Sequence, residues 1–293
     1  MCLPQRSRKR KWNCWAAAAR SAVSDMERVF AHHVDELQEL RQESEQLQLS
    51  FAPQTSGTLV LRLQEEVRLL DLTIHAEDDS EICVFLDIRC AHELKLTQHV
   101  HAGRDAQVKI GILDLEEAAA DYDLHAELDR SGARVEIHTA TLVSADKKWR
   151  MEIVHAHPHT YGYMENFCVV KDDARCQVEA IGSIRKGAYG SESHQKTRIL
   201  TMSAHHHAEA VPVLCIDEHD VKASHAMTLG QPDEEQLYYL QTRGLSKEQA
   251  LGLLSVGYFM PVADLLAHSE MHAQIQYRVE EKVGLYDHRS STR

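Results

Sequence analysis

A long succession of short segments with alternating apolar and polar side chains, from residue 58 to about 230, constrains the fold of this chain most. Examples are TLVLRL, EICVFLDI, AQVKIGILDL and ARVEIHTATLV, each bounded by a few polar residues. A period of two, rich in β-branched residues, is typical of β-strands. No clear helical segment interrupts the pattern, which argues against alternating β–α–β units. The chain is therefore predicted to be mainly β.

Three of these segments resemble one another: DAQVKI at 105–110, GARVEI at 132–137 and DARCQVEA at 173–180. Their starts are separated by 27 and then 41 residues, so the repeat is not regular. A solenoid of short strands with loops of different length would give this pattern, and so would a sandwich or a barrel. Periodicity alone leaves these three architectures open.

Helical patterns are predicted on both sides of the β-rich core at 51–231. In residues 26–50, Phe30, Val34, Leu37 and Leu40 recur at spacings of four and three, which predicts an N-terminal helix. Residues 232–293 form a predicted C-terminal helical region, in which Ser246 and Gln249 have the spacing of a capping box. The helix that follows is apolar around most of its circumference, so it must be covered by its own domain or by a partner.

Composition excludes several classes of function. The net charge is −13, which argues against nucleic-acid binding, although RSRKRK makes residues 1–25 a basic tail that we expect to be disordered. The seven cysteines form no C-x-x-C pair, so neither a disulfide framework nor a zinc knuckle is indicated, and a reducing cytoplasmic setting is expected. No apolar stretch is long enough for a membrane span. No phosphate-binding loop motif is present, so this chain is expected to bind no nucleotide.

Histidines and cysteines are the candidate metal ligands. His155, His157 and His159 alternate in HAHPHT and would share one face of a strand, which permits a zinc or iron site, but Pro158 interrupts that strand. The consecutive His205–His207 point in different directions and make a poor ligand set. Cys168, Cys176 and Cys215 lie in strand-like segments, where cysteine is usually a small buried apolar residue.

The clearest resemblance to a known family covers residues 194–259. The matching features are Gln195 with Thr197, the P-x-L-x-I pattern at Pro212–Ile216, DVK followed by Ser224–His225, the acidic run before LYYL, and the Arg243–Gly244–Leu245 turn. With the weaker match HPHTYGYMENFCVVKDDARCQVEAIGSI upstream, the chain resembles the SufB/SufD family, the core subunits of the SUF iron–sulfur cluster assembly machinery.

That resemblance implies a fold and a set of partners. The fold would be a right-handed parallel β-helix with an N-terminal helix and a C-terminal helical region. The partners would be a SufC-like ABC-type ATPase and a second SufB/SufD-like subunit, paired edge to edge as a homodimer or heterodimer. The expected ATPase-docking residues are Tyr238, Tyr239, Leu240, Arg243, Gly244, Leu251, Leu254, Tyr258 and Phe259.

The resemblance also implies that His225 lies where iron or a nascent cluster is handled, with Cys215, Cys168 and Cys176 as further candidate ligands. Ala223 stands where the family pattern carries cysteine, so no Cys–His pair is available there. The chain lacks the long N-terminal helical region of full-length SufB and SufD, which favours a two-component scaffold. We expect a non-enzymatic scaffold with a transient cluster or iron. A metal-dependent enzyme using the HAHPHT histidines and a purely structural interaction module are the alternatives.

Overall fold

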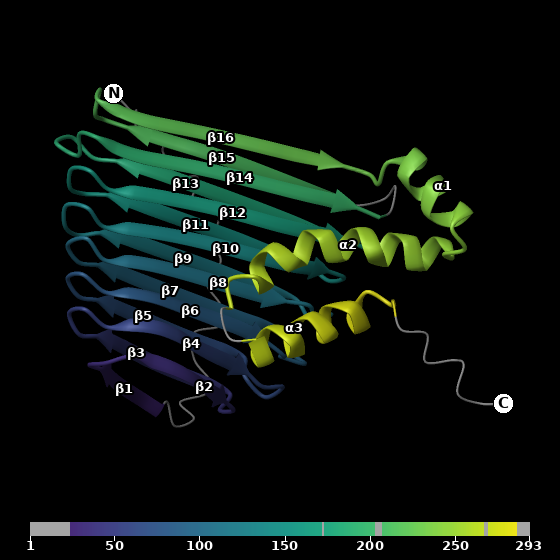
Figure 1. The fold of residues 1–293 in the computed structure, drawn as a ribbon, viewed down its shortest axis with the longest axis horizontal. Helices are drawn as coiled ribbons and strands as arrows, with labels where there is room; N and C mark the ends of the chain where they lie inside the picture. Colours follow the sequence, from purple (N-terminus) through teal and green to yellow (C-terminus); the bar gives the residue numbers. More distant parts are fainter. Residues whose placement is uncertain (1–23, 172, 203–206, 267–268, 286–293) are drawn as a thin grey trace, which may run out of the picture.

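The computed structural model describes residues 24–171, 173–202, 207–266 and 269–285. Sixteen strands in this part of the chain form two parallel eight-stranded sheets, one from the odd-numbered and one from the even-numbered strands (Figure 1). Because each strand pairs with the strand two positions further along the chain, the backbone winds as a β-solenoid with one strand of each sheet per turn. The prediction of a mainly β, parallel β-helical fold is confirmed.

Each of the two sheets runs through the strands in steps of two. Sheet A contains β1 (Ser24–Phe30), β3 (Ser44–Phe51), β5 (Leu69–Ala76), β7 (Leu94–Ala102), β9 (Ala120–Leu128), β11 (Lys147–His155), β13 (Arg175–Ile184) and β15 (His207–Ile216). Sheet B contains β2 (Val34–Leu40), β4 (Ser56–Leu63), β6 (Glu81–Ile88), β8 (Gln107–Asp114), β10 (Arg134–Val143), β12 (Tyr161–Val170), β14 (Ser191–Thr201) and β16 (Val221–Gly230).

The main core lies between the sheets and consists of the inward-facing residues of each strand. Tyr122 stacks on Trp149 with ring centroids 3.7 Å apart, and both rings are buried. One buried ion pair accompanies them: Lys147 Nζ lies 2.5 Å from Asp114 Oδ2, which also accepts a hydrogen bond from the Tyr122 hydroxyl at 2.7 Å. A buried lysine and aspartate are tolerated here because each neutralises the other and further hydrogen bonds satisfy both.

The predicted N-terminal helix at 26–50 is wrong, because this stretch forms β1, β2 and β3. Phe30 ends β1 and stacks on Phe51, whereas Val34 and Leu40 are the two buried ends of β2 and Leu37 is exposed. The apolar residues at helical spacing therefore lie on two different strands, and those on β2 do not share one face. Their helical spacing does not reflect a helix. The alternation in SEQLQLSF, with Leu47, Leu49 and Phe51 buried, is the pattern that the structure uses.

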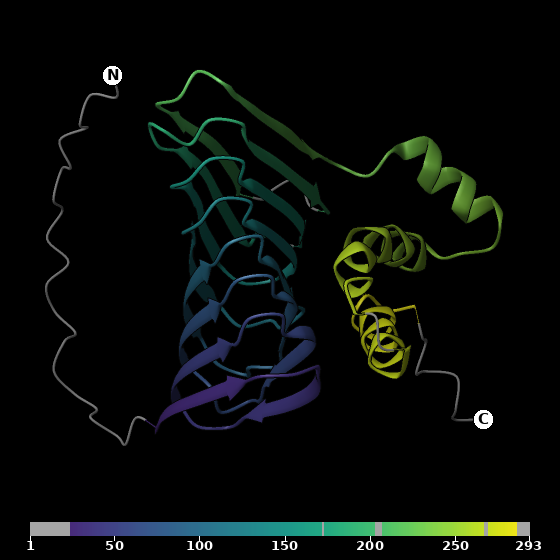
Figure 2. The ribbon, with the colours of Figure 1, turned by 60° about the vertical axis from the view of Figure 1, so that its left-hand side comes forward.

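Three helices follow the solenoid: α1 (Glu234–Thr242), α2 (Lys247–Ala263) and α3 (Ser269–Lys282). The predicted capping box opens α2, since the Ser246 hydroxyl accepts from the Gln249 backbone N–H and the Gln249 side chain accepts from Ser246 N–H. Figure 2 shows α2 and α3 along one side of the strand stack, while α1 extends away from it. No described helix is long and apolar enough to span a membrane.

A second apolar cluster explains how α2 is covered. Phe259, Val262 and Ala263 of α2 pack with Ile275 and Val279 of α3 onto the outer face of sheet B. The sheet contributes Val60, Phe85, Leu113, Ala140, Leu142, Phe167, Val169 and Leu200 to this cluster. The apolar surface of α2 is thus buried against sheet B of the same protein.

Candidate functional site

The last turn of the solenoid is open. β15 and β16 each pair with only one neighbour, β13 and β14 respectively, so one backbone edge of each strand has no partner strand in the described chain. Met227 and Leu229 of β16 are 51% and 43% exposed, and Ile216 at the end of β15 is also exposed. Unpaired edges with exposed apolar side chains favour the addition of another strand.

His225 lies in this last turn, on β16. The register places His225 beside Gln195 and Ala223 beside Ser193, and the side chains of Gln195 and Ser193 are buried between the sheets. Since residues that are neighbours in register share one face of a sheet, His225 and Ala223 belong to the inward-facing column of β16. They are accessible because no further strand of the described chain lies above them. His225 is exposed at this open end.

Polar atoms without partners lie just below this open end, inside the solenoid. Ser193 Oγ, Gln195 Oε1 and His155 Nε2 are buried and make no hydrogen bond. Gly162 is the register neighbour of Ser193. It makes room for the imidazole of His155, because a Cβ at position 162 would lie 2.8 Å from His155 Nε2. Sequence analysis named His155 and Gln195 separately but did not bring the three residues together, because a serine and a glutamine on an alternating strand do not reveal that they face inward. Unpaired buried polar atoms are sites for bound water or a polar ligand.

The candidate cysteines do not gather around His225. Cys168 and Cys176 are fully buried in the main core, where the hydrogen bond that the Cys168 thiol donates to Cys176, and then burial, raise the pKa of the Cys168 thiol well above its usual value. Cys215 is the register neighbour of Ser183, and its strand neighbour Leu214 approaches Gly182 from inside the solenoid. Alternation therefore puts Cys215 on the outer face of sheet A, the face opposite to the interior column of His225.

The three HAHPHT histidines are separated by the structure. His155 is buried, with Nδ1 2.8 Å from Thr160 Oγ1, whereas His157 and His159 are exposed in the turn after β11. His159 has a positive φ of 60° and makes an edge contact with Tyr189. Among the described residues, no group of three or more clustered ligand atoms includes any of these histidines. The His205–His207 run lies largely outside the described residues.

The expected ATPase-docking residues fall into two environments. Tyr238 and Tyr239 of α1 are 71% and 55% exposed, and α1 buries none of its residues. Arg243 holds the Tyr239 ring, with its guanidinium 5.1 Å from the ring centroid and a hydrogen bond of 3.1 Å to the hydroxyl. Phe259 is 0% exposed against sheet B, so it is not available to a partner. The remaining expected docking residues range from half-buried to exposed: Leu240, Gly244, Leu251, Leu254 and Tyr258.

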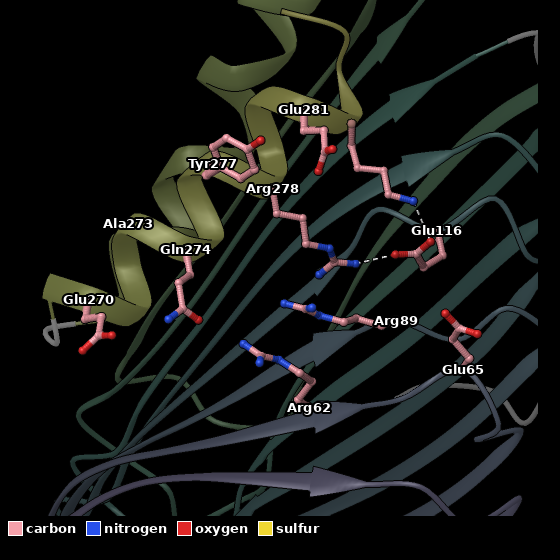
Figure 3. A pocket seen from close by; sticks show the side chains of 11 residues that line it. Arg62, Glu65, Arg89, Glu116, Glu270, Ala273, Gln274, Tyr277, Arg278 and Glu281 are labelled. Atoms are coloured by element: carbon pink, nitrogen blue, oxygen red, sulfur yellow. Dashed lines mark hydrogen bonds and ion pairs between the residues drawn. The ribbon is translucent and has the colours of Figure 1, made fainter. Parts of the chain in front are cut away.

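A charged cavity of about 790 Å³ lies between α3 and the ends of β4 and β6 (Figure 3). Beneath it, the fully buried Asp87 accepts hydrogen bonds from Arg62 at 2.8 Å, from Arg89 and from Arg278 of α3. Arg278 and Lys282 also contact Glu116. Burial opposes ionisation of Glu116, but its hydrogen bonds to Lys282 and Arg278 outweigh burial and lower its pKa. Two carboxylates of the solenoid thus hold two cations of α3 as well as two arginines of the solenoid, so this network anchors α3 to the solenoid.

Comparisons with known proteins agree with this architecture. Residues 72–258 match the family model described as SUF system FeS cluster assembly, SufBD core domain. The chain is 37% identical over 132 residues to the iron-sulfur cluster assembly protein SufD of Bacillus subtilis, a match that covers 45% of this chain and 30% of that protein.

Two mycobacterial relatives are more distant. A SufBD family protein of Mycobacterium bovis is 28% identical over 136 residues, covering 45% of this chain and 16% of the relative. A SufBD family protein of Mycobacterium leprae is 31% identical over 109 residues, covering 37% of this chain and 28% of the relative. Each match thus spans less than a third of the relative's length. Because the core-domain model covers well over half of the chain, from β5 of the solenoid into α2, this chain belongs to the SufB/SufD family.

Proposed function

We propose that this protein is a non-enzymatic scaffold subunit for iron–sulfur cluster assembly, which works with a separate ABC-type ATPase and a second SufB/SufD-like subunit. The observation that carries the proposal is the open last turn of a SufBD core solenoid, with His225 at its end. The names of the relatives, which describe iron–sulfur cluster assembly, support the same role.

The second subunit would pair with the free edges of β15 and β16. Such pairing would cover Met227, Leu229 and Ile216 and would satisfy the edge N–H and C=O groups. It would also bring groups of the partner next to His225. A cluster generally requires thiolate ligands in addition to imidazole, and Ala223 supplies none, so the missing ligands would come from the partner or from the cargo itself.

The ATPase would dock on α1. This helix exposes two tyrosines, is tied to β16 by a short link, and packs against α2. A motion of the ATPase could then reach the last turn of the solenoid through residues 231–233, because the link joins α1 directly to β16. Aromatic side chains on an exposed helix are frequent anchors of protein interfaces.

The docking prediction is tested by co-expression with candidate ABC-type ATPases and by affinity capture of the complex. The double variant Tyr238→Ala/Tyr239→Ala should lose at least about 30-fold in affinity, since each central aromatic anchor contributes on the order of 2 kcal/mol. Tyr277→Ala is the matched control, because Tyr277 is also an exposed helical tyrosine but lies on α3. Capture of the double variant at wild-type strength would refute docking on α1.

The cluster-handling prediction is tested by anaerobic reconstitution of the full chain with its co-expressed partners, followed by visible absorption spectroscopy. His225→Ala should lower the absorbance of the iron–sulfide bands, because it removes an exposed imidazole from the open end. His219→Ala, which alters an exposed histidine in the preceding turn, should leave the spectrum unchanged. Binding of the ATPase without any iron–sulfide absorbance would favour the structural interaction module, and full cluster content in His225→Ala would exclude His225 as a ligand.

A further inference from the structure

A separate cluster of ligating side chains lies on the outer face of sheet A, in the middle of the solenoid. It consists of His101, Glu127 and Asp129, whose ligand atoms all lie within 4.8 Å of one another. In the described part of the chain this is the one group of three or more such residues. The cluster is on the opposite side of the solenoid from α2, which packs on sheet B.

The parallel register explains why these residues meet. His75, His101 and Glu127 are neighbours on β5, β7 and β9, strands that follow one another in Figure 1. Asp129 lies two residues beyond Glu127, and its backbone N–H continues the ladder by donating to Ala102 O at 3.0 Å. The side chain of Asp129 therefore points to the same outer face of sheet A as the side chain of Glu127. His101 Nδ1 and Asp129 Oδ2 are 2.9 Å apart.

We propose that His101, Glu127 and Asp129 bind a divalent first-row transition-metal ion, such as Fe²⁺ or Zn²⁺. Imidazole and carboxylate ligands suit these ions, and a thiol-free set disfavours Cu⁺. Ligands of one such ion lie about 2.0–2.2 Å from it and hence roughly 3–4 Å from each other. His101 Nδ1 and Asp129 Oδ2 now share a hydrogen bond of 2.9 Å, at the short end of this range, which the ion would replace. All three ligand atoms lie within 4.8 Å of one another, so small side-chain movements would bring them to the spacing of one ion.

The surroundings leave room for the ion and for exchangeable ligands. A cavity of about 530 Å³ adjoins His101 and Asp129 and is also lined by His75, Asp78 and His157, together with the exposed Arg104 and Arg130. His75 stacks on His101 with ring centroids 5.0 Å apart, which fixes the plane of the proposed ligand. Three protein ligands with an open side are typical of metal sites that exchange water or substrate rather than of closed structural sites.

Of the arginines near the cluster, Arg185 is paired with a proposed ligand. Arg185 donates to Glu127 Oε1 at 2.7 Å, but its side chain is 56% exposed. Ion pairs with this much solvent contact contribute about 0–1 kcal/mol, so a divalent ion would displace the guanidinium readily. The net charge of −13 also favours the approach of cations over anions. The metal site is independent of the scaffold function proposed above and would exist in the isolated subunit.

The test is titration of the purified full chain with Co²⁺, followed by its visible absorption, and competition with Zn²⁺. His101→Ala and Asp129→Asn should each weaken this site by at least about 10-fold, as expected when a ligand or its orienting partner is removed. Arg185→Ala should tighten it, because the competing cation is gone. His99→Ala is the matched control, since His99 lies on the same strand and face two residues away and should bind as the wild type does.

Two results would overturn the proposal. One is a Co²⁺ spectrum and stoichiometry in His101→Ala equal to those of the wild type. The other is an equal loss in His101→Ala and His99→Ala, which would mean that the chain's 20 histidines bind metal unspecifically. His101 and Asp129 are only half-buried on the outer face of sheet A, so thermal denaturation of the metal-free variants should match the wild type and exclude misfolding as the cause.

Discussion

Replacing Asp87 with alanine is expected to lower the free energy of unfolding by about 3–5 kcal/mol, because it removes the carboxylate from a buried ion-pair network. Asp87 is 0% exposed and faces Arg62, Arg89 and Arg278. Without it, Arg62 and Arg278 remain largely buried with fewer acceptors and repel each other. Urea denaturation followed by circular dichroism measures the change as a lower midpoint.

The same variant should loosen α3 in particular, since Arg278 is the residue of α3 that reaches Asp87. Hydrogen exchange should therefore speed up in α3 more than in the central strands.

Asp123→Ala is the control: Asp123 also faces an arginine, at 3.3 Å, but is 54% exposed, so its loss should cost less than about 1 kcal/mol. If both variants lose the same stability, the buried network does not anchor α3. If Asp87→Ala does not fold at all, Arg89→Ala removes a peripheral member of the same network and should give a smaller loss in the same direction.

The strands of the core could be predicted from the sequence because apolar and polar side chains alternate along them. The irregular repeat is also explained by the structure. The 27-residue offset between DAQVKI and GARVEI is one full turn, since Gln107 of β8 and Arg134 of β10 are register neighbours. The 41-residue offset leads to β13, which belongs to the other sheet. The third segment is thus one and a half turns further on, and a search for equal spacing could not recognise it.

The ends of the chain were harder to predict because their burial depends on contacts distant in sequence. Phe30 and Val34 have helical spacing, but Phe30 contacts Phe51, which lies on the next strand of sheet A. The apolar α2 indicated a covered helix, yet only the outer face of sheet B, with Phe85 and Phe167, identifies what covers it. Helical periodicity shows that a face is buried and does not name its partner.

The candidate sites show the same limit. The family motif located His225 without showing that its column faces inward, which depends on its register with Gln195. The proposed metal site could not be found from a local motif, because His101 and Glu127 are 26 residues apart and meet through strand pairing. The sequence LTQHVHA, with His99 and His101 on one face of a strand, was its only local signal.

Acidification is expected to destabilise this protein through His155. Burial, with a smaller effect of His194, lowers the pKa of His155 from 6.5 to about 4. The unfolded chain binds a proton at this residue below pH 6.5, whereas the folded protein does so only near pH 4. The stabilisation is therefore complete above pH 6.5 and is lost progressively as the pH falls towards 4, by roughly 3 kcal/mol in total.

The measurement is urea denaturation of the wild type and of His155→Gln at several pH values between 7 and 4.5. The variant lacks the titrating imidazole, so its free energy of unfolding should fall less steeply over this range, and the two curves should converge at low pH. His157→Gln changes an exposed histidine two residues along the chain and should keep the wild-type slope. Parallel curves for the wild type and His155→Gln would mean that His155 is protonated equally in the folded and unfolded states. In that case a polar group or a water molecule would have to bind His155 Nε2 and stabilise the charged imidazole. The polar interior of the solenoid below His225 would then contain water.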